Sequence, residues 1–283
     1  MPLIGGRIYN KRHSCRPGKH GAALFPPTQT TGGAARRNWR IPYAYTANWT
    51  ESRGCIEMCG RFALKNPRAI QASFGLDEMP DLPPRYNIAP SQDIAIVRFS
   101  PAGRHLSLAH WGLIPSWAQE SDKSYSTINA RAETVDSKPS FRVAFRDHRC
   151  LIPADGFYEW HEEGGIKQPY HISRRDGAPF ALAGLWDLWK GPHGDVLSCS
   201  IIVTGANDFM RPLHERMPVI LDPADYERWL DPDNHDTAAL KQLLVPPPDD
   251  WLTAWRVSRQ LNNPRREGRV CAQPIAAQQD AAP

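Results

Sequence analysis

No stretch of this 283-residue sequence is apolar for long enough to cross a membrane as a helix, which takes about 20 residues. A secretory signal is also lacking, because the apolar start Met1-Pro2-Leu3-Ile4 stops at two glycines and is followed by basic residues. The six cysteines show no C-x-x-C spacing, so neither a zinc site nor a disulfide framework is indicated. We therefore expect a protein of the reducing cytoplasm that has no membrane partner.

Acidic residues are scarce in the first 57 positions. This segment holds nine Lys or Arg against Glu51 and Glu57, a balance of +7, whereas the rest of the chain, with 25 basic and 28 acidic residues, has a balance of −3. The segment is rich in Pro, Gly, Thr, Arg and Asn and shows no apolar periodicity of 2 or 3.6 residues. We predict that residues 1–57 are a disordered basic leader that is absent from the mature protein. An organelle transit peptide has a similar composition but would need an amphipathic helix.

The 225 residues from Cys59 onward suffice for one hydrophobic core, and we expect a domain over residues 58–263 with a loose tail over 264–283. Strands are predicted at Ile94–Phe99, Leu106–Trp111, Arg149–Pro153, Phe157–Trp160, Tyr170–Ser173, Phe180–Trp186, Ser198–Thr204 and Trp255–Ser258. Helices are predicted from Asn66 to Phe74, Ser140 to Arg146, Pro223 to Leu230 and Thr237 to Leu244, and a hairpin turn at Glu162–Gly165. Cys150 and Cys199 have apolar neighbours and are expected in the core. The pattern predicts an α+β fold with an extensive, mostly antiparallel, barrel-like sheet and a few peripheral helices.

Cys59 would be the first residue if translation started at Met58 and the initiator were removed. An N-terminal cysteine places a thiol beside a free α-amine, whose pKa of roughly 7.7 to 8.0 leaves a useful fraction unprotonated near neutral pH. Such an aminothiol captures aldehydes, because the amine forms a Schiff base and the tethered thiol closes it into a five-membered thiazolidine. An internal cysteine has no such amine, so this chemistry requires that the residues before Cys59 be missing or removed.

Six short words follow one another along the chain: Met58-Cys59-Gly60-Arg61-Phe62, Arg85-Tyr86-Asn87-Ile88-Ala89-Pro90, His110-Trp111-Gly112-Leu113-Ile114-Pro115, Ile128-Asn129-Ala130-Arg131-Ala132-Glu133, Ala154-Asp155-Gly156-Phe157-Tyr158-Glu159-Trp160 and His214-Glu215-Arg216-Met217-Pro218. Together, and in this order, they resemble the SOS-response-associated peptidase family, also called abasic site processing proteins. The resemblance runs from residue 58 to about residue 263. The leader departs from the pattern, because the family begins at its cysteine.

The resemblance implies an enzyme that crosslinks itself covalently, through Cys59, to the ring-opened aldehyde of an abasic site in single-stranded DNA. It implies acid/base catalysis by Glu159, whose aromatic neighbours would raise its carboxyl pKa by partial burial. His214 is implied as a proton shuttle, and a β-elimination (lyase) reaction would use the same group. Asn129 is implied to hold the adduct or the amine through its amide. Each residue also has a structural reading when taken alone: an exposed strand carboxylate, a packed histidine and a turn asparagine.

Four arginines lie within the matching words, and a guanidinium suits bidentate contacts to phosphate. We therefore expect Arg61, Arg85, Arg131 and Arg216 to contact DNA. Trp111 is expected to stack on bases, as are Trp117 and Trp160, although core packing is an alternative for each. Binding should be independent of sequence, because the lesion supplies the specificity. The scheme uses no metal or other cofactor, and we expect a monomer that associates with the nucleoid when bound to DNA.

Two other functions fit the same residues. Cys59, His214 and Glu159 also match a cysteine protease arrangement of thiol, base and orienting carboxylate, acting on the chain itself or on other proteins. A catalytically silent binder of single-stranded DNA would result if residues 1–57 were retained, because the amine of Cys59 would then be blocked. The state of that amine discriminates among these functions.

Overall fold

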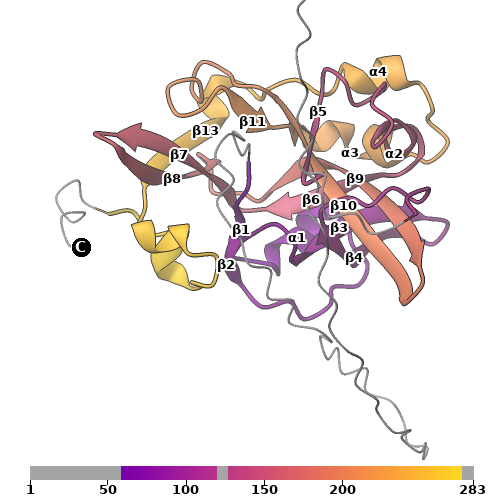
Figure 1. The fold of residues 1–283 in the computed structure, drawn as a ribbon, viewed down its shortest axis with the longest axis horizontal. Coiled ribbons are helices and arrows are strands. Elements are labelled where there is room, and N and C mark those ends of the chain that lie inside the picture. The colour runs from indigo at the N-terminus through magenta and orange to yellow at the C-terminus, as the bar shows by residue number, and fades with distance from the viewer. Residues whose placement is uncertain (1–58, 120–126, 276–283) are drawn as a thin grey trace, which may run out of the picture. The chain divides into compact units, whose positions relative to one another are not determined.

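The computed structural model of the chain describes residues 59–119 and 127–275 (Figure 1). The predicted leader over residues 1–57 and the end of the predicted tail, residues 276–283, lie outside the described residues. All described residues belong to one compact unit, residues 54–283, that contains two β-sheets and a few short helices. The predicted α+β class with an extensive, mostly antiparallel sheet is confirmed. Within the described residues, no helix has the length and apolarity that a membrane crossing would need.

The first sheet has five strands, all antiparallel, in the order β13-β8-β7-β1-β2. They are β1 (Phe62–Leu64), β2 (Arg85–Ile88), β7 (Gly156–Glu163), β8 (Ile166–Arg174) and β13 (Leu252–Arg256). The predicted hairpin joins β7 to β8 at Gly164 and Gly165, whose φ angles of 57° and 81° favour glycine. This sheet positions the site, because Cys59 lies three residues before the start of β1 and Glu159 lies on the adjacent strand β7.

The second sheet contains a closed barrel of five strands. They are β3 (Asp93–Ser100), β4 (Gly103–Trp111), β6 (Arg149–Ala154), β9 (Phe180–Gly191) and β10 (Gly194–Gly205). Closure depends on β10, which pairs antiparallel with β9 and parallel with β4. Three short strands extend the sheet: β5 (Asn129–Arg131), β11 (Arg216–Pro218) and β12 (Ile220–Leu221). The barrel-like sheet predicted from the sequence is therefore present.

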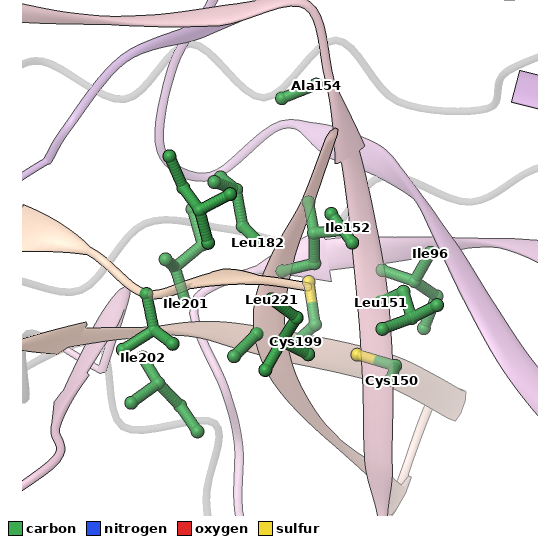
Figure 2. Close-up of a cluster of buried hydrophobic side chains, with 14 of the residues drawn as sticks. Ile96, Cys150, Leu151, Ile152, Ala154, Leu182, Cys199, Ile201, Ile202 and Leu221 are labelled. Carbon is green, nitrogen blue, oxygen red and sulfur yellow. The ribbon is translucent and has the colours of Figure 1, made fainter. Parts of the chain in front are cut away.

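The barrel encloses the core, in which branched side chains surround two sulfur atoms. Figure 2 shows Cys150 and Cys199 among Ile96, Ile152 and Ile201, and both cysteines are fully buried, as predicted. Gly184 is required beside them, because a Cβ there would lie 2.7 Å from the Cys150 sulfur and 2.8 Å from Ile152 side-chain carbons.

The helices are short and peripheral. They are α1 (Ala69–Phe74), α2 (Arg142–Asp147), α3 (Tyr226–Leu230) and α4 (Thr237–Lys241), with 3₁₀ turns η1 (Pro223–Asp225), η2 (Asp249–Trp251), η3 (Arg259–Asn262) and η4 (Arg269–Cys271). Helices α1, α3 and α4 fall inside predicted helical ranges, and α2 ends one residue past the predicted range, at Asp147. The Pro223–Leu230 range divides into η1 and α3, and the side chain of Asp222 caps its start by accepting from the Ala224 N–H.

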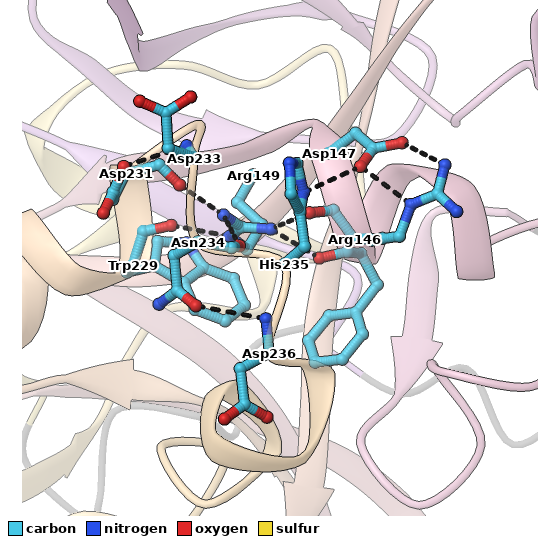
Figure 3. Close-up of polar contacts among 10 residues, drawn as sticks. Arg146, Asp147, Arg149, Trp229, Asp231, Asp233, Asn234, His235 and Asp236 are labelled. Atoms are coloured by element: carbon cyan, nitrogen blue, oxygen red, sulfur yellow. Dashed lines mark hydrogen bonds and ion pairs between the residues drawn. The ribbon is translucent and has the colours of Figure 1, made fainter.

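Arg149 joins the ends of α2 and α3, and its side chain is only 4 % exposed. Its guanidinium donates to the carbonyls of Trp229 at 2.7 Å, Phe145 at 2.9 Å and Asp231 at 2.6 Å. Figure 3 shows Arg149 with Trp229 and Asp231 around it. Further bonds reach the carbonyls of Asn234 and Arg146. The Arg149 guanidinium thus lies at the C-terminal ends of α2 and α3, where backbone carbonyls lack partners within the helix and a positive charge is favourable.

The tail predicted to be loose from residue 264 is folded as far as residue 275, so this prediction is wrong for residues 264–275. We call residues 257–275 the C-terminal strap. Val257, Leu261 and Cys271 of the strap are fully buried against Ala63 and Tyr158. Because successive strand residues point to opposite faces, the strap covers the face of β7 opposite to Glu159. Many of the hydrogen bonds that hold the strap involve backbone groups. Such bonds do not require apolar residues at regular spacing, so the sequence contains no sign of a folded segment.

Candidate active site

Cys59 lies at the entrance to β1 and is 3 % exposed. Its backbone N–H donates to the Glu159 Oε1 atom at 3.0 Å. Its φ of 40° lies in the left-handed region, which costs a residue with a Cβ about 1 kcal/mol. The backbone nitrogen, and not only the thiol, is therefore aimed at the carboxylate.

Glu159 is 2 % exposed and lies on β7, opposite Tyr170 of β8. Burial raises the pKa of this carboxyl from 4.5 to about 7, and the nearby charge of His214 and the hydrogen bonds from Cys59 oppose the rise. A carboxyl with this pKa is present in both protonation states near neutral pH, which suits a group that both gives and takes protons.

The Cys59 thiol is not preactivated in this environment. Burial raises its pKa well above 9.0, and the charge of Glu159 and a hydrogen bond to that carboxylate raise it further. A buried thiol of this kind is a poor nucleophile until a base removes its proton. Glu159 is the group in contact with it that can act as that base.

His214 lies between β10 and β11, close enough to Glu159 for its charge to lower the carboxyl pKa. Its Nδ1 atom is 3.0 Å from both the N–H and the carbonyl oxygen of Arg216. A neutral ring that carries its proton on Nε2 accepts from this N–H, whereas a ring protonated on Nδ1 donates to the carbonyl. The backbone N–H and carbonyl of Arg216 can therefore hold the ring both when Nδ1 accepts and when it donates, as a proton shuttle requires.

Asn129 lies on β5, which pairs with β10, and the loop that contains His214 follows β10. β5 pairs parallel with β10, with Asn129 opposite Ile201, while β11 pairs with β10 through residues that include Val203. The carbonyl of the preceding residue, Ile128, accepts the indole N–H of Trp111 at 2.9 Å. Through Trp111, which packs edge-on against Phe62 at 5.3 Å, the Asn129 segment is linked to β1.

The four predicted DNA-contacting arginines are in different situations. Arg131 has an exposed side chain at the end of β5. Arg216 forms an ion pair with Glu133, which lies two residues after Arg131. Arg85 donates to the Asp93 carbonyl at 2.7 Å and to the Gln92 side chain, and so braces its own loop. Arg61 donates from Nη1 to the Asn87 Oδ1 atom and to the Leu261 carbonyl, each at 2.7 Å.

The three tryptophans also differ in exposure. Trp111 is fully buried, so no base can stack on it and the expected DNA contact of this residue is wrong. Trp117, in the loop after β4, is 61 % exposed. Trp160 is partly exposed, and its indole N–H donates to the Asn262 Oδ1 atom at 2.7 Å. The sequence distinguished none of these cases, because burial of a tryptophan depends on pairing between distant strands.

The described residues contain no group of three or more His, Cys, Asp or Glu side chains that could hold a metal ion. The arrangement is instead a buried nitrogen, thiol and carboxyl cluster with a histidine beside it. Chemically, a carboxyl and a histidine placed in this way can transfer protons to and from a thiol and, where the Cys59 nitrogen is a free amine, to and from that amine.

Comparison with known proteins gives a consistent result. Residues 58–264 match the sequence profile of the family described as SOS response associated peptidase (SRAP). The abasic site processing protein YoqW of Bacillus subtilis strain 168 is 42 % identical over 216 residues, which cover 74 % of this chain and 96 % of YoqW. The abasic site processing protein HMCES of Xenopus tropicalis is 33 % identical over 204 residues, covering 64 % of this chain and 60 % of HMCES.

Solved structures share the fold. A protein from Bacteroides thetaiotaomicron superposes with a TM-score of 0.69 at 28 % identity, covering 77 % of this chain and 100 % of that protein. A Bordetella bronchiseptica protein gives a TM-score of 0.63 at 30 % identity, covering 71 % of this chain and 100 % of that protein.

Proposed function

Because the chain belongs to the SOS response associated peptidase (SRAP) family, we propose that it processes abasic sites in DNA through a covalent bond to Cys59. The bond is a thiazolidine formed with the ring-opened aldehyde in single-stranded DNA, and it shields the lesion from strand scission. One observation supports this most strongly: the backbone nitrogen of Cys59 lies 3.0 Å from a buried carboxyl group whose pKa is about 7. An ordinary cysteine protease has no use for such a contact.

The reaction balances without a metal, cofactor or redox partner. The unprotonated α-amine of Cys59 attacks the aldehyde carbon, and loss of one water gives a Schiff base. The thiol then adds across the C=N bond, so that sulfur bonds to the carbon and its proton goes to nitrogen. Glu159 takes a proton from the attacking amine and gives it to the departing oxygen, and in the second step it passes the thiol proton to nitrogen. The reverse sequence, with addition of water, releases the aldehyde.

The Cys59–Glu159 contact changes when Cys59 is the first residue. The amide N–H is then replaced by an α-ammonium group, whose positive charge beside the Glu159 carboxylate lowers the carboxyl pKa and raises that of the amine. The two groups titrate as a pair that shares protons. Proton transfer between amine and carboxylate therefore needs no movement of either residue.

The remaining residues serve DNA binding and proton transfer. His214 is proposed to shuttle the Schiff-base proton, and Asn129 to hold the adduct by its amide. Arg131 and Trp117 present the exposed charge and aromatic surface for contacts to phosphate and base, respectively. Arg61, Arg85 and Arg216 can reach phosphate only by sharing or exchanging their present partners. We propose that the protein acts as a monomer and associates with the nucleoid when bound.

The proposal requires a free α-amine on Cys59. Every described element lies at or after this residue, so a chain that begins at Cys59 keeps the whole described fold. Incubated with single-stranded DNA that contains one abasic site, this chain should give a heat-stable adduct on a denaturing gel, also in the presence of a chelator. Cys59→Ser and Cys59→Ala should abolish the stable adduct. A heat-stable adduct formed by both variants would sink the thiazolidine assignment.

The same experiment separates the other functions. A peptidase needs a thiolate, but burial and Glu159 raise the pKa of the Cys59 thiol, which argues against proteolysis. Cleavage of a protein substrate without a DNA adduct would favour the peptidase. DNA binding without an adduct would favour the silent binder, and strand cleavage at the abasic site would reveal lyase activity.

A further inference from the structure

We propose that the C-terminal strap, residues 257–275, is part of the active site, with Asn87 and Asn262 as positioning residues for the neighbours of Cys59 and Glu159. The inference rests on the proposed function and deepens it, because it names what sets the rate of crosslinking. The strap extends past residue 264, where the match to the family ends.

Two consecutive strap residues accept hydrogen bonds, one from a side chain close to Cys59 and the other from the side chain next to Glu159. The Leu261 carbonyl accepts from Arg61, two residues after Cys59, at 2.7 Å. The Asn262 Oδ1 atom accepts from the indole N–H of Trp160, directly after Glu159, also at 2.7 Å. The Arg61 guanidinium lies 5.8 Å from the centre of the Trp160 ring, within range of a cation–π contact. The strap therefore ties together the two segments that bring the Cys59 nitrogen to the Glu159 carboxyl.

Asn87 of β2 connects Arg61 to the strap from the other side. Its side chain is fully buried, and its Oδ1 atom accepts from Arg61 at 2.7 Å. Its Nδ2 atom donates to the strap carbonyls of Arg266 at 2.8 Å, Asn263 at 3.1 Å and Leu261 at 3.3 Å. A buried amide with this set of partners favours one position of the strap, because a buried polar group that loses its partner is destabilising.

Glu267 fixes the middle of the strap to β2, the edge strand of the first sheet. Its carboxylate accepts from the backbone N–H of Tyr86 at 2.9 Å and of Asn87 at 3.2 Å, where a further strand would otherwise pair with β2. The Tyr86 carbonyl in turn accepts from the Tyr158 hydroxyl at 2.6 Å. Tyr158 is the other neighbour of Glu159, so both residues beside Glu159 are connected to the strap.

The strand that carries Cys59 needs this support. β1 has three residues and pairs with β7 at only two register positions, Phe62 with Phe157 and Ala63 with Gly156. A displacement of about 1 Å at reacting groups can cost 100-fold in rate. We therefore expect a loosened strap to slow crosslinking far more than it weakens DNA binding.

The test uses the chain that begins at Cys59 and two exposed positions of the strap, Asn262 and Glu267. Asn262→Ala removes the acceptor for Trp160, and Glu267→Ala removes the acceptor for the β2 backbone, whereas Asn262→Asp keeps an acceptor. Gln260→Ala is the matched control, because Gln260 is an exposed strap residue two positions before Asn262. Single-turnover crosslinking is followed with saturating abasic single-stranded DNA. Affinity is measured with the same oligonucleotide carrying an unreactive tetrahydrofuran residue, and folding by thermal denaturation.

Both alanine variants should crosslink roughly tenfold more slowly or worse, with affinity within about twofold of the parent. Asn262→Asp should recover most of the rate, and Gln260→Ala should leave it unchanged. Parental rates in both alanine variants would overturn the inference, as would rate losses that merely follow the fraction unfolded without rescue by Asn262→Asp. If the parent chain itself forms no adduct, the proposed function fails, which is a different result from a parent that reacts and variants that react equally well.

Discussion

At the scale of single residues, Glu159 shows how catalysis and stability oppose each other. The carboxyl is buried on a central strand, where the charged form is poorly solvated, and its pKa rises to about 7 for that reason. The same shift that makes it a useful acid and base at neutral pH penalises the folded state once it ionises. Linkage therefore gives a direct check on its environment.

In the full chain, in which Cys59 is in a peptide bond, Glu159 should make the free energy of unfolding depend on pH. The folded-state pKa of Glu159 lies above its ordinary value of 4.5, so its stabilising contribution is complete below about pH 4.5 and is lost as the pH rises through about 7. Glu159→Gln should therefore raise the free energy of unfolding at pH 8 by about 1–3 kcal/mol and change it little at pH 4.5. Denaturant titrations at both pH values measure this difference.

Glu162→Gln, at an exposed position on the same strand, is the control and should show no such pH dependence. A Glu159→Gln effect of equal size at both pH values would mean that Glu159 does not titrate near neutrality in the fold. In the chain that begins at Cys59, the same substitution should slow crosslink formation or reversal and leave DNA affinity nearly unchanged.

The sequence identified Cys59, Glu159 and His214, because each lies in a word of the family pattern, and the structure brings these three together. It could not separate Trp111 from Trp117, six positions apart in one mostly apolar stretch. Asn262 and Glu267 were missed for another reason: their partners are an indole N–H and backbone groups far away in the chain. Contacts of this type impose no residue pattern.

At the scale of elements, Arg149 supplies hydrogen-bond donors to the C-terminal ends of α2 and α3. The two helices that it joins are only six and five residues long and have no side-chain cap at their N-termini. Helices of this length are marginal alone. The guanidinium supplies donors to carbonyls at both C-terminal ends, and its charge is favourable there.

Arg149→Met keeps the length of the side chain but leaves several buried carbonyls without a donor. We expect it to lower the free energy of unfolding by about 3 kcal/mol or more, since each unsatisfied buried group costs about 1–3 kcal/mol. Arg146→Met, at an exposed residue whose ion pair is with the adjacent Asp147, should have a much smaller effect, because exposed ion pairs contribute little to stability. Equal effects of the two substitutions in urea titrations would contradict the role given to Arg149.

The long strands were predictable and the short ones were not. The predicted strands at Ile94–Phe99, Leu106–Trp111 and Ser198–Thr204 lie inside β3, β4 and β10, which have eight or more residues each. The strands β1, β5 and β11 have three residues each, too few to show an alternation, yet they adjoin or contain Cys59, Asn129 and Arg216. The site is thus built on strands whose pairing is decided by the rest of the sheet.

At the scale of the whole molecule, charge is divided between the two parts of the chain. The balance is −3 from residue 58 onward and +7 before it. DNA binding by the described fold must therefore come from local basic groups, of which Arg131 is exposed. The segment before residue 58 would add a strong, unspecific attraction to phosphate wherever it is retained.

Salt dependence measures this division. With a tetrahydrofuran oligonucleotide, log K should fall with log salt at about −0.7 per phosphate contact, which gives about −1.5 to −3 for the chain that begins at Cys59. Arg131→Gln should make that slope shallower by about 0.7. The full chain should show a steeper slope, and equal slopes for the two chains would contradict the charge argument.

The fold class and a barrel-like sheet followed from the sequence, but the pair of strands that closes the barrel did not. β4 and β10 meet in parallel through His110 with Ser198 and Trp111 with Cys199, and these residues are far apart in the chain. No local pattern encodes such a contact, because its entropy cost is repaid only once the whole core has assembled. That closure is also what buries Trp111.

The central claim is that Cys59 reacts as a free aminothiol held against Glu159. Intact-mass analysis of the chain that begins at Cys59, after incubation with a single-stranded oligonucleotide bearing one abasic site, tests it most directly. We expect one adduct, with the summed mass of protein and oligonucleotide less one water, and no adduct from the full chain, in which Cys59 is in a peptide bond. The same adduct from the full chain, or from Cys59→Ala, would contradict it.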